Sequence, residues 1–157
     1  MRKLFLLFSS LAASAVVLTS SGCAGIGVAA REVEVVLRGA SEVPANRSAA
    51  AGKGTFWVHS DRTLNGYVET SGIEATAAHL HLGLPGISGP VALELERTSN
   101  VGPLAMEHLP LSGANWSVPR SARFSEEQYA AFLAGEIYVH VHSAAYPEGE
   151  IRGQLRP

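Results

Sequence analysis

The sequence predicts an all-β fold, an antiparallel Greek-key sandwich or barrel of about seven or eight strands with one short helix. Short runs of alternating apolar and polar residues recur along the chain, and most are bounded by Gly, Pro, Asn, Asp or Ser. The composition agrees, because 16 Gly, 8 Pro and only 17% charged residues are typical of a turn-rich β protein. With 157 residues, the chain has room for one domain of ordinary size.

The first expected strand covers residues 31–39, where Val33, Val35 and Leu37 occupy alternate positions. The next segment, 41–52, has the composition of a loop. The remaining expected strands are 54–60, 63–72, 76–83, 90–96, a short one within 114–118, 135–143 and 149–155.

The one expected helix covers residues 125–135. Ser125 is a favourable N-cap, and Gln128 at the third helical position completes a capping box. Gly135 supplies the C-terminal stop.

The N-terminus has the pattern of an export signal. Arg2 and Lys3 precede an apolar run over residues 4–18. This run is shorter than the about 20 apolar residues that a membrane-spanning helix needs. We therefore expect an exported protein, either a periplasmic or outer-membrane-anchored lipoprotein or, alternatively, a secreted protein.

Two cleavage positions fit this signal. Ser20-Ser21-Gly22-Cys23 resembles a bacterial lipoprotein signal, in which the cysteine is lipidated and anchors the protein to the membrane. The single cysteine of the chain lies where this interpretation needs it, and it excludes an internal disulfide. The resulting organisation is a signal peptide at 1–22, a linker at 23–32 and a β domain at 33–157. Alternatively, small residues at 28–30 allow ordinary cleavage and a signal peptide at 1–30.

The charge balance excludes one class of partner. The chain has 12 basic and 14 acidic residues, and removal of Arg2 and Lys3 with the signal leaves a net charge of −4. A nucleic-acid-binding surface needs a basic stripe, and none is present. The partners that remain are a metal ion, the membrane through a lipid anchor, and an envelope or extracellular protein.

Four of the six histidines form two HxH pairs, His79 and His81 in AHLHLG, and His140 and His142 in YVHVHS. Residues two apart on a strand point to the same face. The apolar residues of each segment therefore face the core, and all four imidazoles point away from it. If the two strands are adjacent and in register, the imidazoles can approach a common point. Imidazole nitrogen binds zinc and copper, so the pattern predicts a copper or zinc site.

The alternative is that these histidines are solvated polar positions on the outer face of a half-buried sheet. The other two histidines, His59 and His108, are expected to have structural or surface roles.

Other outward positions carry charge, namely Glu94, Glu96, Glu150 and Arg152. These residues either form a solvated, salt-bridged face of low energetic value, or one carboxylate orients an imidazole by accepting its second N–H.

Three segments, LRGASEVP, AAHLHLGLPGISGPVALEL and FLAGEIYVHVHSAAYPEGEIRGQL, resemble the CHRD domain, named from chordin and widespread in secreted bacterial proteins. The resemblance covers residues 33–156. It implies the fold and export, and in chordin such domains belong to an extracellular antagonist of growth factors. His140 and Tyr146 stand where the family commonly has Asn, so a metal site cannot be transferred from the family as a whole.

A second likeness is to copper/zinc superoxide dismutase, a Greek-key barrel whose copper ligands include an HxH strand. AHLHLG and YVHVHS would be the counterparts, and Arg152 is similar to its substrate-guiding arginine. The dismutase disulfide cannot form here, and no His- and Asp-rich zinc loop follows the first HxH strand.

Three classes of function therefore remain open. The first is an exported metal-binding protein that uses His79, His81, His140 and His142. The second is an envelope interaction module that uses the loops 84–90 and 143–149 as its contact surface. The third is an enzyme, including a dismutase-like one, for which no nucleophile or triad can be recognised.

Overall fold

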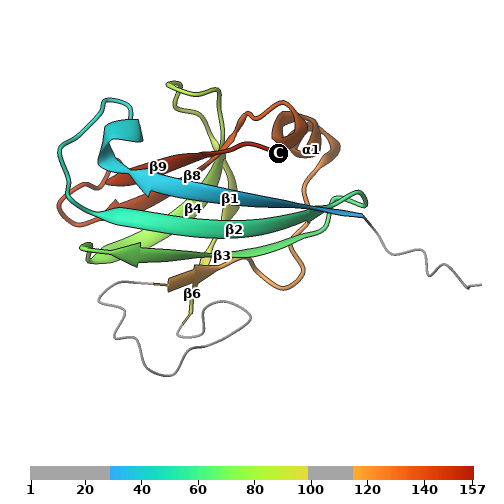
Figure 1. The fold of residues 1–157 in the computed structure, drawn as a ribbon, viewed down its shortest axis with the longest axis horizontal. Helices are drawn as coiled ribbons and strands as arrows, with labels where there is room; N and C mark the ends of the chain where they lie inside the picture. Colours follow the sequence, from blue (N-terminus) through green and yellow to red (C-terminus); the bar gives the residue numbers. More distant parts are fainter. Residues whose placement is uncertain (1–28, 99–114) are drawn as a thin grey trace, which may run out of the picture.

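The computed structural model describes residues 29–98 and 115–157, which form a nearly closed antiparallel β-barrel with one short α-helix (Figure 1). Every strand pairing is antiparallel, as the sequence predicts. The strands are β1 (Ala30–Arg38), β2 (Ala51–His59), β3 (Leu64–Ser71), β4 (Ala75–Leu82), β5 (Val91–Glu94), β6 (Glu96–Thr98), β7 (Asn115–Ser117), β8 (Ile137–Ser143) and β9 (Ile151–Leu155).

The strand order is β5-β4-β8-β9-β1-β2-β3-β7-β6. The hairpin-connected strands β1, β2 and β3 lie side by side, and β9 returns from the far end of the chain to pair with β1, as in Greek-key folds. The two end strands, β5 and β6, are consecutive in the chain and separated by Leu95 alone. The sheet therefore curls until its two ends meet.

The segment 90–96, expected to be one strand, is divided at Leu95 into β5 and the start of β6. The first part pairs with β4 and the second with β7, because the barrel closes at this point. Val91, which alternates with the outward Glu94 and Glu96 and should by that pattern face the core, is exposed at 50%, whereas Leu95 is buried.

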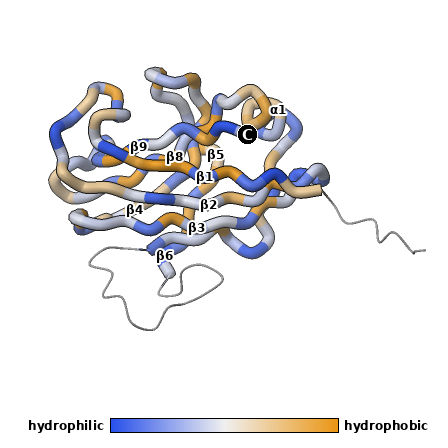
Figure 2. Tube along the Cα trace, viewed as in Figure 1, coloured by the Kyte–Doolittle hydropathy of each residue, from blue (hydrophilic) through white to orange (hydrophobic). Residues whose placement is uncertain are grey.

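The core lies inside the barrel and is built from alternate residues of the strands. Hydrophobic and hydrophilic residues are interspersed along the strands (Figure 2), as a half-buried sheet requires. Burial of one such side chain contributes about 1.5–3 kcal/mol. Fully enclosed members of the core are Leu37, Phe56, Val58, Val68, Leu80, Phe132, Ile137, Val139, Val141, Ile151 and Leu155.

The helix α1 (Glu126–Leu133) lies where the sequence predicts it and covers one end of the barrel (Figure 1). Ser125 accepts a hydrogen bond from the Gln128 N–H, and the Gln128 side chain accepts one from the Ser125 N–H. Phe132 anchors the helix in the core. Gly135, with φ +73°, ends it in a backbone conformation that favours glycine. A 3₁₀ turn, η1 (Gly39–Ser41), follows β1. Among residues 29–98 and 115–157, no helix has the length and apolarity needed to cross a membrane.

The outer face of β4, β8 and β9 is partly covered by two loops. Loop 83–90 lies over Tyr138 and Arg152, and loop 42–50 is held against the turn between β8 and β9. These two loops turn an outward-facing strand surface into a partly enclosed polar site.

Candidate metal centre

Strand pairing brings the two HxH segments together. β4 and β8 are adjacent and antiparallel, with His79 opposite His140, His81 opposite Tyr138 and Ala77 opposite His142. The adjacency of these strands was the condition for a shared site, and the structure meets it. The imidazoles lie on the face of the sheet opposite the buried residues of the barrel core, as predicted.

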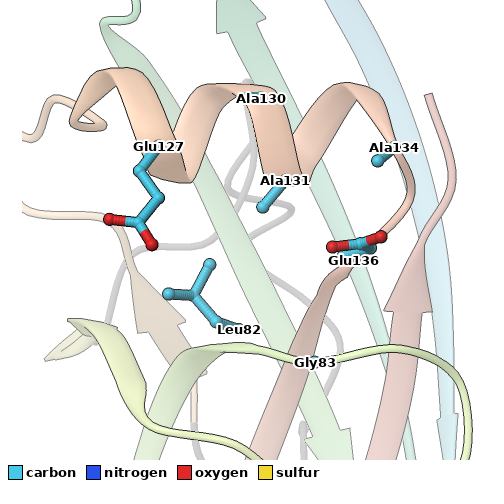
Figure 3. Close-up of a pocket in the computed structure, with 7 residues that line it drawn as sticks. All are labelled: Leu82, Gly83, Glu127, Ala130, Ala131, Ala134 and Glu136. Atoms are coloured by element: carbon cyan, nitrogen blue, oxygen red, sulfur yellow. The ribbon is translucent and has the colours of Figure 1, made fainter.

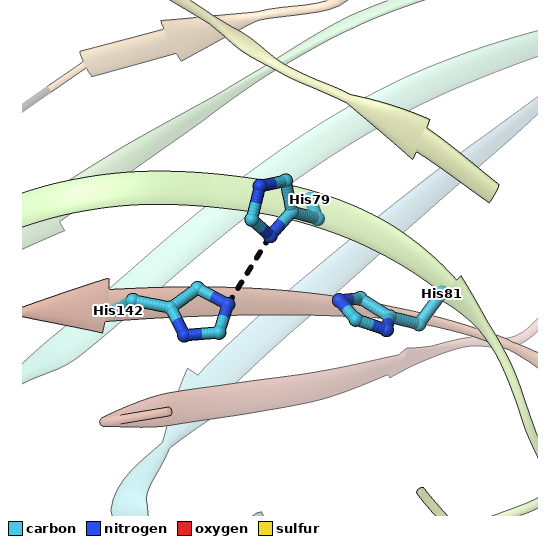
Figure 4. Close-up of side chains that lie close together, drawn as sticks. All are labelled: His79, His81 and His142. Carbon is cyan, nitrogen blue, oxygen red and sulfur yellow. Dashed lines mark hydrogen bonds between the residues drawn. The ribbon is translucent and has the colours of Figure 1, made fainter. Parts of the chain in front are cut away.

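Three imidazoles form a compact group, called here the histidine cluster: His79, His81 and His142 (Figure 4). One ring nitrogen from each lies within 4.8 Å of the others. The shortest separation, 3.1 Å, joins His79 Nδ1 to His142 Nε2. His81 is buried, and the other two residues are half-buried. Only His81 is removed from solvent, and His79 and His142 keep partial exposure.

Backbone carbonyls fix the orientation of two of the rings. His81 Nδ1 lies 2.9 Å from the Gly89 carbonyl oxygen, and His142 Nδ1 lies 2.9 Å from that of Pro147. A carbonyl oxygen only accepts, so both Nδ1 atoms carry the proton and both Nε2 atoms keep a lone pair. The lone pair of His81 Nε2 is buried and has no hydrogen-bond partner.

The third ring, His79, shares one proton with His142. Since His142 Nδ1 is already protonated, His79 Nδ1–H donates to His142 Nε2. A bound cation would replace this proton and accept both nitrogens as ligands.

Burial keeps the histidine cluster neutral. It is the main cause of the lowered pKa values of His79 and His142, and it lowers the pKa of His81 to about 4. Charge on neighbouring imidazoles lowers the three pKa values further. Neutral imidazole is the form that binds metals, so the cluster is ready to coordinate at neutral pH.

The fourth predicted ligand, His140, lies beside the cluster but not in it. Its ring centroid is 4.3 Å from that of His142 and 5.1 Å from that of His81. His140 Nε2 lies 3.0 Å from Glu42 Oε2, in loop 42–50. Both residues are more than nine-tenths buried, with 9% and 8% exposure. His140 therefore faces a buried carboxylate rather than solvent.

Arg152, expected on a solvated face, is buried at 2% exposure and fixes loop 83–90. Its guanidinium lies 3.5 Å over the Tyr138 ring, and Nη2 donates to the carbonyls of Leu84 (3.1 Å) and Ile87 (2.9 Å). Tyr138 Oη accepts from the Gly89 N–H at 3.1 Å. This network fixes Gly89, the residue whose carbonyl orients His81.

Glu150 was also expected at an outward position, and it too is buried. It accepts hydrogen bonds from the hydroxyls of Ser48 and Ser143 and does not contact an imidazole. Asn46 Nδ2 donates to the Glu150 carbonyl at 3.0 Å. These contacts tie loop 42–50, which carries Glu42, to the end of β8 and the start of β9.

Glu94 and Glu96 are exposed, as the solvated interpretation predicts. Glu94 stands opposite His79 across β4 and β5. No periodic pattern identified Glu42, because it lies in a loop. Within residues 29–98 and 115–157, its carboxylate is the one that forms an ion pair with an imidazole. His59 lies on β2, 3.4 Å from Asn65 Nδ2, and outside the cluster. His108 and Cys23 lie outside the described residues.

A separate groove of about 400 Å³ runs between α1 and the end of β4 (Figure 3). Glu127 and Glu136 stand at its two ends, with Leu82 between them and alanines of α1 along one wall. Leu82 points to the opposite face of β4 from His81, so this groove is not part of the histidine cluster.

The fold and site define a class of protein: a small antiparallel barrel that carries a covered polar site on the outside of one group of strands. Residues 33–155 match the CHRD domain, and the chain belongs to this family. The resemblance in its sequence motifs is thereby confirmed. Neither a curated protein nor a solved structure gives a match to the chain.

Proposed function

We propose that this protein is an exported CHRD-domain protein that binds a copper or zinc ion through His79, His81 and His142. The observation that carries the proposal is the convergence of three neutral imidazoles, two of which are oriented by backbone carbonyls. In metal sites, a ligating histidine almost always donates its other N–H to a carboxylate, carbonyl or water. His81 and His142 have this arrangement.

The distances suit a small tetrahedral ion. Two nitrogens bound at about 2.0–2.1 Å to such an ion stand about 3.3 Å apart. His79 Nδ1 and His142 Nε2 are 3.1 Å apart, and His81 completes a group no wider than 4.8 Å. A modest contraction at His81 would therefore be enough for three-ligand coordination.

The ligand type selects among cations. Calcium and magnesium require oxygen ligands, whereas imidazole suits zinc and copper. Nearby carboxylates favour a cation as well, because Glu94 raises the pKa of His79, and Glu42 and Glu148 raise that of His142, against the lowering by burial. The same negative potential attracts a metal ion.

Export places the site outside the cytoplasm. The family suggests an extracellular or envelope module, and the N-terminal pattern supports an export signal with Cys23 as the lipidation site. The mass of the mature N-terminus tests this part. A lipid-modified Cys23 supports anchoring, a chain that begins after Ala30 supports secretion, and an intact Met1 in a purified envelope fraction contradicts both.

Metal analysis tests the site directly. We expect the mature protein, without a histidine tag, to retain about one equivalent of Cu(II) or Zn(II) after desalting. A variant with alanine at positions 79, 81 and 142 should retain almost none, and His59→Ala, as the matched control, should bind normally. Retention below about 0.2 equivalents by the unmodified protein would contradict the proposal.

A second candidate function is an envelope interaction module without metal. Loop 84–90 favours it, since Leu84 and Ile87 are 52% and 56% exposed. This function predicts that Leu84→Ser combined with Ile87→Ser abolishes partner binding. Replacement of the four histidines of the HxH pairs should leave partner binding unchanged.

A further inference from the structure

Unpaired polar atoms are concentrated beside the histidine cluster. Among the described residues, six buried side-chain polar atoms lack a hydrogen-bond partner, and four of them belong to Glu42, His81 and His140. They are Glu42 Oε1, His81 Nε2 and both ring nitrogens of His140. Native proteins rarely leave such atoms unpaired, because each costs about 1–3 kcal/mol. Their concentration in one place indicates a ligand that engages more than three histidines.

We infer that Glu42 and His140 complete the metal site, with His140 Nδ1 as the fourth ligand and Glu42 as the acceptor of the His140 Nε2–H. This inference rests on the proposed metal binding and adds two residues to it. It makes the centre a four-imidazole site with one carboxylate behind it.

The protonation state of His140 follows from its neighbour. His140 Nε2 lies 3.0 Å from Glu42 Oε2, an ion-pair distance without the geometry of a hydrogen bond. An ionised carboxylate only accepts hydrogen bonds, so forming this bond by a small rotation of the ring puts the proton on Nε2. The lone pair of a neutral ring is then on Nδ1, which has no partner. A carboxylate–histidine–metal arrangement has this assignment of proton and lone pair.

The position of the ring is also suitable. His140 lies opposite His79 in the strand pairing, and its ring touches those of both His81 and His142. His140 is not part of the group of nitrogens within 4.8 Å, so ligation requires its Nδ1 to move toward the histidine cluster. Glu42 also supplies a negative charge that offsets part of the charge of a divalent cation in a buried place.

The surroundings fix this pair. Gly149, with φ +132°, lies against the His140 ring, and a β-carbon there would coincide with Nε2. The contacts of Asn46 and Ser48 with Glu150 fix the loop that carries Glu42. Two separate chain segments therefore position the Glu42–His140 pair.

The number of ligands can be counted without any variant. We expect pulsed electron paramagnetic resonance of the Cu(II)-loaded mature protein to show four coordinated imidazole nitrogens. Three coordinated imidazoles would overturn the inference and leave the proposed function intact. Absence of Cu(II) and Zn(II) binding would overturn the proposed function and this inference together.

Two variants with the same charge change test the role of Glu42. Glu42→Gln removes the carboxylate that faces His140, whereas Glu148→Gln removes an exposed one near His142. We expect Glu42→Gln to weaken Cu(II) or Zn(II) binding about 10- to 100-fold, the usual effect of losing an orienting partner, and Glu148→Gln less than about threefold. Affinities would be measured by chelator competition, with each variant shown to be folded by circular dichroism. Equal effects of the two variants would overturn the role of Glu42.

His140→Gln separates ligation from packing. The glutamine amide can still donate to Glu42, but it has no imidazole nitrogen. The Cu(II) spectrum of this variant should show one coordinated imidazole fewer than that of the unmodified protein. An unchanged count would overturn the inference.

Discussion

The outer faces of two groups of strands have the same polarity pattern but different surroundings. On β1, β2 and β3, the outward residues Glu32 and Glu34 are exposed and His59 is half-buried, as His79 and His142 are. On β4, β8 and β9, the outward residues His140 and Arg152 are buried at 9% and 2% exposure. The difference comes from the connections, because loops 42–50 and 83–90 cover the second face.

Burial beneath these loops changes what a histidine side chain can do. An imidazole in solvent is held in no particular orientation, but His81 is buried, kept neutral and aimed by the Gly89 carbonyl. The site therefore depends on the loops as much as on the histidines. The following predictions test this dependence, from the largest expected effect to the smallest.

The largest effect is expected on metal affinity when one clustered histidine is removed. His142→Ala takes away a nitrogen 3.1 Å from its neighbour and should weaken Zn(II) binding at least about 100-fold, more than the loss of an orienting partner. His59→Ala, on the open face, should leave it unchanged. Isothermal titration would measure both. Equal affinities for the two variants would mean that the cluster is not the site.

A smaller effect is expected on stability when the cover is loosened. Arg152→Ala leaves the Leu84 and Ile87 carbonyls without their donor and removes the contact with Tyr138. It should lower the free energy of unfolding by about 2–3 kcal/mol. Lys53→Ala, at an exposed position of β2, should change it by less than about 0.5 kcal/mol. Urea denaturation of the metal-free protein would show whether the two faces differ in this way.

Lowering the pH should reduce the free energy of unfolding through His81, which lies on the covered face. The unfolded chain protonates His81 near the ordinary histidine pKa of 6.5, but burial lowers the pKa of His81 in the folded protein to about 4. The unfolded state therefore binds more protons between these values, and stability falls as the pH decreases through this range. Relative to His81→Gln, the metal-free protein should lose stability from pH 7 to pH 4. Parallel stability curves for the two proteins would contradict this cause.

The smallest effect is expected from one hydroxyl. Tyr138→Phe keeps the stacked ring but removes the acceptor for the Gly89 N–H. We expect a loss of about 1 kcal/mol in stability and a severalfold weaker metal affinity, because Gly89 orients His81. Tyr67→Phe is the matched control for hydroxyl removal, because Tyr67 is half-buried on β3, away from the histidine cluster. A change confined to stability would show that the Gly89 carbonyl does not need this support.

The sequence predicted the strand faces well, because a period of two residues is a local property. Val33, Val35 and Leu37 are buried, and the two HxH pairs face away from the core, as alternation requires. The helix was predicted from its own capping residues, Ser125 and Gln128. Each of these features depends on neighbours in the chain.

The remaining features depend on distant contacts. Alternation cannot tell whether an outward face is covered, so the burial of Arg152 and Glu150 was missed. Glu42 reaches His140 only because a loop 98 positions earlier folds over β8. The shared site required β4 and β8 to be adjacent, and the pairing of distant strands could not be predicted from alternation along either one.

Position 149 is occupied by glycine, which has no side chain, and this limits how the sequence of the domain can diverge. Any larger residue there would meet an unfavourable backbone angle and occupy the space of the imidazole at position 140. The two positions, nine residues apart, therefore cannot drift independently. A descendant that replaces the glycine must first give up the imidazole, whereas one that keeps the glycine is free to exchange His140 for a smaller residue.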